Sequence, residues 1–292
     1  MSYLFLAIVL FSGTAKGYCG KKTSNFANHL YDAAYINAIR FAICALISGV
    51  LCVAQGGFSA LLNFDGLWVA ALSGVLQAAF VTTWLLAVRT GAYTMLDAFL
   101  TAGILIPSLL SHFAYGEHIK PVQWIGFVLL ILAVIIMCSY NNSIKKKITF
   151  GALMLLIACS ASSGVENFTQ KILKYAYPEV LPSTYSFYSY LFAMLSLAVV
   201  FLIVKPKNEK PCSVKNFGIY LIIMAVCLFL NTYFKTLAAQ GLDASIMYPI
   251  CQGGALVLSS AMAAIMFKEP IKKRSVLGIV MIFTALMIIT FA

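Results

Sequence analysis

Five ionisable side chains stand inside long apolar runs of the sequence: Lys16, Arg40, Asp97, Glu166 and Lys235. In a membrane-spanning segment a charge is costly, so such groups normally face a cavity or a charged partner. Amino and guanidinium groups bind anions, whereas carboxylates bind cations or carry protons. The two signs together favour a small solute that bears both charges over a simple cation.

Asp97 is the carboxylate that lies deepest within its run. It belongs to a polar stripe whose members are spaced by four, three, four and seven residues, as expected for one face of a helix: Thr90, Thr94, Asp97, Thr101 and Ser108. At 1.5 Å per residue it stands ~9 Å inside the helix. We favour a functional role for Asp97. A structural ion pair with Arg40, in the same half of the chain, is the alternative.

Two interpretations stay open for both Lys16 and Glu166. Lys16 either faces a cavity or extends its ammonium group to the membrane surface. Glu166, in a polar segment with Ser160, Ser163, Asn167 and Gln170, either faces the same cavity or pairs near its helix end with Lys171 or Lys174.

Amide and aromatic side chains also occur at helical spacing, so that the two members of each pair lie on one face of a helix. The pairs are Gln77 with Trp84, Asn231 with Lys235, and Tyr248 with Gln252. A single amide between helices is often only packing, but together these groups suit a small polar solute. Pro249 frees a carbonyl four residues upstream and can break the helix beside Tyr248. The candidate substrate-binding residues are Lys16, Arg40, Gln77, Trp84, Asp97, Glu166, Asn231, Lys235, Tyr248 and Gln252.

The composition assigns the elements that carry these residues to a membrane. Hydrophobic residues make up 62% of the chain and charged residues 10%, whereas soluble domains are about half apolar and a quarter charged. Runs near the ~20 residues needed to cross a bilayer lie at 3–20, 33–54, 66–88, 92–115, 121–140, 150–170, 183–204, 216–238, 243–267 and 275–291. We expect an all-α protein with ten transmembrane helices, multi-pass in the cell membrane.

Other classes of function are disfavoured by what the sequence lacks. The net charge of +11 comes from short basic clusters at the ends of apolar runs, which indicates membrane flanks rather than nucleic-acid binding. There is no C-x-x-C pair, no metal-ligand spacing of histidines, no Walker A loop and no G-x-S-x-G. We therefore expect no catalytic residue, no metal and no cofactor.

An internal repeat divides the chain. At an offset of 150 residues Gly91 matches Gly241 and Gly103 matches Gly253, and at 152 further matches follow in order: Glu117 with Glu269, Ile119 with Ile271, Gly126 with Gly278, and Ala133 with Ala285. We expect two five-helix repeats, 1–144 and 145–292. Because five is odd, the second copy enters the membrane from the opposite side. This is the inverted-repeat plan of secondary transporters that work by alternating access.

Each copy has a small residue opening a helix, a proline within it, a glutamate at its end, and a glycine starting the final span. In this order the chain resembles the EamA-type, ten-span branch of the drug/metabolite transporter superfamily, most closely over 85–137 and 234–290. The resemblance implies ATP-independent transport of small metabolites such as amino acids, nucleosides, sugars or organic cations.

The function expected is secondary transport of a small polar or zwitterionic, amino-acid-like metabolite. Efflux of cationic drugs is the alternative, which Lys16 disfavours because small multidrug exporters carry an essential glutamate in that region. A structural membrane subunit without transport is a further alternative. The expected partners are the solute and the lipid bilayer, without nucleic acid. Proton coupling, a monomer and a homodimer are all compatible with the sequence.

The loops that follow odd-numbered spans hold fourteen basic residues, against four after even-numbered spans when Lys235, near the end of its run, is included. The positive-inside rule places the basic loops in the cytoplasm and both termini outside. Members of the family usually keep both termini in the cytoplasm. We favour the charge count, because an inverted repeat works in either orientation.

Overall fold

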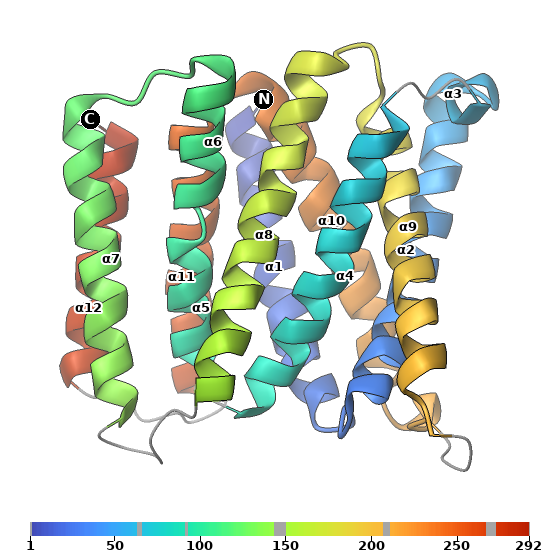
Figure 1. Cartoon of the computed structure of the whole chain (residues 1–292), viewed down its shortest axis with the longest axis horizontal. Helices are drawn as coiled ribbons and strands as arrows, with labels where there is room; N and C mark the ends of the chain where they lie inside the picture. The colour runs from blue at the N-terminus through green and yellow to red at the C-terminus, as the bar shows by residue number, and fades with distance from the viewer. Residues whose placement is uncertain are drawn as a thin grey trace.

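The computed structural model describes residues 2–62, 66–90, 93–142, 150–206, 211–266 and 273–291. In these ranges the regular structure is helical throughout (Figure 1). The elements are α1 (Ser2–Ser24), α2 (Leu30–Gly56), α3 (Ser59–Leu62), α4 (Leu67–Thr90), α5 (Tyr93–Ala102), α6 (Leu105–Tyr115), α7 (Pro121–Asn142), α8 (Phe150–Ala176), α9 (Pro182–Val204), the 3-10 turn η1 (Val214–Asn216), α10 (Gly218–Gly241), α11 (Ala244–Met266) and α12 (Lys273–Phe291).

Within the described residues, six helices are long and apolar enough to cross a membrane: α1, α2, α4, α8, α9 and α10. Shorter apolar stretches occur at 99–115, 121–136 and 276–290. Large apolar side chains also point outward, such as Phe11 at 72% and Ile203 at 77% exposure. A soluble monomer rarely presents so much apolar surface, whereas a bilayer covers it. The chain is a multi-pass membrane protein.

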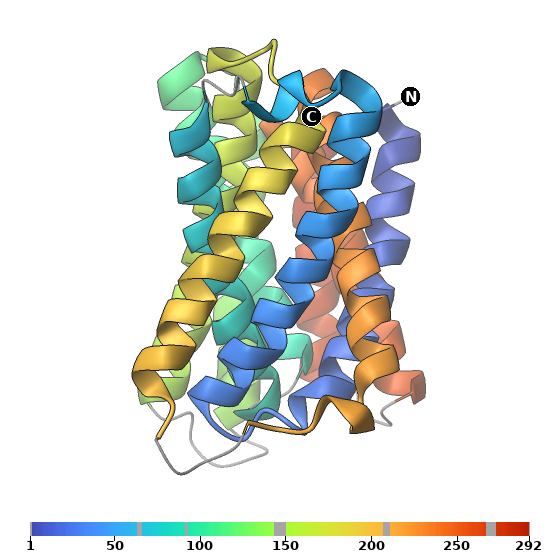
Figure 2. The same cartoon turned by 90° about the vertical axis from the view of Figure 1, so that its right-hand side faces the viewer.

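The helices lie side by side in an upright bundle, with both termini at the same end (Figure 1). The principal packed pairs are α1 with α10, α2 with α9, α7 with α12, α4 with α8, and α4 with α9. Seen from the side, α2 and α9 slant across one edge of the bundle (Figure 2). The pair α7–α12 forms the opposite edge (Figure 1). Helices α1, α4, α8 and α10 therefore occupy the middle.

The fourth apolar run, expected as one helix, is broken into α5 and α6 at Gly103 and Ile104. Pro107 has no N–H, so the Gly103 carbonyl loses its helical donor, and it accepts from Ile106 N at 3.2 Å instead. Gly103 also packs closely on α8, where a Cβ would stand 2.9 Å from the Ser160 carbonyl oxygen. The expected stripe is interrupted here, because Thr101 and Ser108 lie on different helices.

The predicted break at Pro249 is wrong, because α11 continues through it. Pro249 removes the donor to the carbonyl of Ser245, whereas Pro107 removes the donor to Gly103 four residues before it. Glycine forms helices much less readily than serine. We attribute the difference between the two helices to the residue that loses its hydrogen bond.

Candidate functional site

A cavity of about 120 Å³ lies in the middle of the bundle, where α1, α2, α4, α5, α8, α10 and α11 meet. All of these helices except α5 contribute candidate residues to its lining, which holds eight of the ten: Lys16, Arg40, Gln77, Trp84, Glu166, Asn231, Lys235 and Gln252. Most of these residues lie near the middle of their helices, so crossing of the helices at mid-depth brings them together.

Small residues on α1 make room for this meeting. A Cβ at Gly13 would stand 3.2 Å from Asn231 Nδ2, and one at Gly20 would stand 2.5 Å from the Trp84 ring. Asn231 thereby reaches the backbone of α1 and donates from Nδ2 to the Val9 carbonyl at 2.8 Å. Close contact of α1 with α10 and α4 thus depends on glycine at these two positions.

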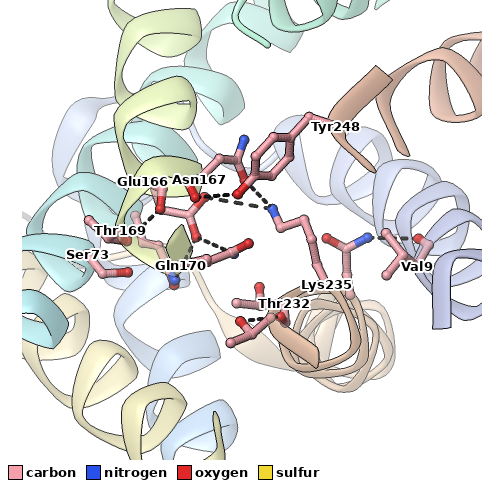
Figure 3. Close-up of polar contacts among 12 residues, drawn as sticks. Val9, Ser73, Glu166, Asn167, Thr169, Gln170, Thr232, Lys235 and Tyr248 are labelled. Atoms are coloured by element: carbon pink, nitrogen blue, oxygen red, sulfur yellow. Dashed lines mark hydrogen bonds and ion pairs between the residues drawn. The ribbon is translucent and has the colours of Figure 1, made fainter. Parts of the chain in front are cut away.

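Glu166 is the carboxylate of the cavity among the residues whose side chains are described. Its Oε1 accepts from Gln77 Nε2 at 3.2 Å and from Gln170 Nε2 at 3.5 Å. Lys235 Nζ lies 3.8 Å from Glu166 Oε2 and donates to Asn167 Oδ1 at 2.6 Å (Figure 3). The carboxylate is therefore held by two amides and one ammonium group.

The alternative partner considered for Glu166, Lys171, pairs elsewhere. Lys171 follows Glu166 by five residues, which turns it about 140° around the helix. It forms an ion pair with Glu117 instead. Of the two interpretations of Glu166, the structure places the side chain in the cavity.

Lys16 and Arg40 enter the same cavity from α1 and α2. Lys16 lies within electrostatic range of Arg40, Lys235 and Glu166, so it faces the cavity rather than the membrane surface. Arg40 is 2% exposed. Its Nε has no hydrogen-bond partner in the described part of the chain.

Among the candidates whose side chains are described, Tyr248 is the one that does not line the cavity. The Tyr248 hydroxyl donates to the Asn167 carbonyl at 2.5 Å and ties α11 to α8. The backbone of Asp97 belongs to α5, but its side chain lies outside the described residues, and the proposed pair with Arg40 lies there with it.

Between the cavity and the end of the bundle where α8 terminates lies a network that sequence reasoning missed. Lys171 Nζ is 2.8 Å from Glu117 Oε1 and donates to the Leu242 carbonyl at 2.6 Å. Glu117 also accepts from Ala244 N at 2.7 Å and from the Tyr175 hydroxyl at 3.0 Å. The two charged side chains are 0% and 4% exposed, so this is a buried ion pair.

Sequence reasoning placed Glu117 at the end of a helix and considered Lys171 as a partner of Glu166. Glu117 binds the start of α11, and Lys171 lies within α8. The available signal was its spacing of four residues from Asn167, which continues the polar face of that helix.

The EamA-like transporter family model matches residues 149–291. Over these residues, just under half of the chain, the sequence is similar to the EamA-like transporter family. The predicted resemblance is confirmed, and members of this family are transporters rather than enzymes. The EamA-like segment spans α8 to α12 and supplies Glu166, Asn231, Lys235 and Gln252 to the cavity.

Other comparisons bear on the fold alone. One similar solved structure, a protein crystal structure, covers 97% of this chain and 96% of its own, with a TM-score of 0.66 and 14% sequence identity. A search of curated proteins finds no match. The chain therefore shares its complete fold with a protein of similar length.

Proposed function

We propose that the protein is a secondary transporter that moves a small polar or zwitterionic solute by alternating access, with the central cavity as its binding site. The observation that carries this proposal is the gathering of Lys16, Arg40, Glu166 and Lys235 around one mid-depth cavity. A structural membrane subunit has little reason to keep such costly groups inside its helices.

The packing supports two inverted five-helix repeats, 1–144 and 145–292, with α5 and α6 together as one of ten spans. In this scheme α1 corresponds to α8, α2 to α9, α4 to α10 and α7 to α12. The contact of α1 with α10 then has its counterpart in the contact of α8 with α4. The chain also runs in opposite directions through α1 and α8 (Figure 1), and the family model begins near the proposed boundary.

The two sides of the cavity differ in a way that supports alternating access. Toward one end, the Glu117–Lys171 pair joins the two proposed repeats. Toward the other end, Trp84 packs in an apolar cluster with Leu221 and Met224. Opening the first side requires this ion pair to separate, whereas opening the second separates the apolar contacts of this cluster.

Transport in proteoliposomes tests the proposal. Purified protein is first screened for ligands by thermal shift, since a solute at 100 times its dissociation constant adds about 2.7 kcal/mol to apparent stability. Solutes that bind are then tested for exchange. Glu166→Gln should abolish exchange. Ser196→Ala should not, because the Ser196 hydroxyl bonds to the Phe192 carbonyl of its own helix and does not line the cavity.

Asp97→Asn separates the two interpretations of that residue. If Asp97 is a ligand or proton carrier, the folded variant loses exchange. If Asp97 is a structural partner of Arg40, the variant loses stability, and Arg40→Gln restores part of it. A protein that binds and exchanges no solute in the screen would be a structural subunit, and the proposal would be wrong.

A further inference from the structure

Positive charge predominates in the cavity. Its described lining includes three cationic side chains, Lys16, Arg40 and Lys235, against one carboxylate, Glu166. If Asp97 is added as a second carboxylate on the strength of the sequence, the cations still outnumber the acids.

The charged groups of the cavity differ in how far they are already paired. Glu166 already has Gln77, Gln170 and Lys235 around it. Among the residues whose side chains are described, no hydrogen bond or ion pair joins Lys16 or Arg40 to another side chain. The guanidinium carbon of Arg40 lies 5.5 Å from the centre of the Phe41 ring. The charge available for a ligand therefore lies on the α1–α2 side of the cavity.

Like charges held near one another in a poorly solvated space destabilise each other, and each buried charge is itself costly. A bound anion removes both penalties. We propose that the transported solute carries a net negative charge and that its acidic group, a carboxylate or a phosphate, binds between Lys16 and Arg40. This inference rests on the proposed transport function and narrows the class of solute.

The remaining lining suits the rest of such a solute. Asn231, Thr232 and Gln252 offer neutral polar groups, and a cavity of about 120 Å³ favours a small molecule over a drug-sized one. Arg40 is the better of the two cations for recognising a planar acid, because a guanidinium group donates two parallel hydrogen bonds.

A size-matched set of four-carbon probes tests the charge. The probes are succinate, aspartate, asparagine, 2,4-diaminobutyrate and putrescine, whose net charge increases in this order from negative to positive. Phosphoserine and inorganic phosphate are added as probes that carry a phosphate group. Thermal shift of the purified protein and exchange of labelled probe in proteoliposomes are measured. We expect binding and exchange with the negatively charged probes and none with putrescine. Comparison of these two phosphate probes with succinate and aspartate distinguishes a phosphate site from a carboxylate site.

Arg40 variants test the assignment of the acidic group. Arg40→Gln should weaken binding of the preferred anion ~10- to 100-fold, as expected for loss of charge-assisted hydrogen bonds. Arg40→Lys should recover part of it. If Arg40→Gln does not fold, Lys16→Gln serves as the second variant, with the same direction of change.

The outcomes separate this inference from the proposed function. Exchange of only neutral or cationic solutes, or anion binding unaffected by both Arg40→Gln and Lys16→Gln, overturns the inference and leaves transport standing. Exchange of no solute of any charge overturns both.

Discussion

Breaking the buried Glu117–Lys171 pair should open one side of the cavity. In Lys171→Met the ammonium group that now contacts Glu117 and the Leu242 carbonyl is lost. Removal of one partner from a buried pair typically costs 3–5 kcal/mol. Here Glu117 keeps Ala244 N and the Tyr175 hydroxyl, so we expect the lower end, ~3 kcal/mol. That free energy corresponds to a roughly 100-fold shift in population toward the open state.

A native thiol can report this shift. Cys251 is buried and lines the cavity, so a variant that retains Cys251 as its single cysteine reacts with a maleimide only when a path to the cavity opens. Labelling of Lys171→Met should be faster by up to two orders of magnitude. Glu117→Gln should act in the same direction, and the double variant should add little, because both changes disrupt one interaction.

Lys174→Met is the matched control. Lys174 lies on the same helix, where it stacks over the Tyr175 ring at 4.9 Å, and it takes no part in the buried pair. The reasoning is refuted if well-folded Lys171→Met labels at the parental rate, or if Lys174→Met labels as fast as Lys171→Met.

Two further predictions concern orientation and packing. The bias in basic residues predicts that Asn25 lies in the cytoplasm and Ser59 outside; both positions are exposed. In intact cells, an impermeant thiol reagent should therefore label Ser59→Cys but not Asn25→Cys, each introduced into a cysteine-free variant. The reverse pattern would place the basic loops outside. Gly74→Ala should destabilise the protein by ~1–3 kcal/mol, because its Cβ would stand 2.5 Å from the Ser189 carbonyl oxygen. Gly151→Ala, with open space around it, should be neutral in the same thermal unfolding measurement.

The meeting of the charged side chains at one cavity could be predicted from the sequence, because a charge inside an apolar helix is stable only beside a cavity or a partner. Lys16, Arg40, Glu166 and Lys235 all turn to the cavity for that reason. The periodic spacing of Asn231 and Lys235 also survives, since α10 is an unbroken helix. These inferences use only the composition and period of single helices.

What failed depended on contacts between helices or on the balance of local effects. The pairing of Lys171 with Glu117 joins residues 54 positions apart, and no local pattern specifies it. The break in the fourth run depends on both Pro107 and Gly103, whereas a proline alone at 249 leaves its helix intact. A proline in a membrane helix therefore indicates a position where the helix can break. Whether it breaks depends on the residue four positions earlier, which loses its hydrogen bond.

Because the connection between α10 and α11 is short, the buried ion pair contacts the ends of both helices. Only Leu242 and Asp243 separate these two helices, and the pair holds a backbone group at each side, the carbonyl of Leu242 and the N–H of Ala244. Movement of the two side chains apart would loosen the ends of both helices together, because each side chain holds one of them. Partly open arrangements are then unfavourable, so this side of the cavity should be either closed or open. Uncoupled leakage of solute through it should therefore be rare.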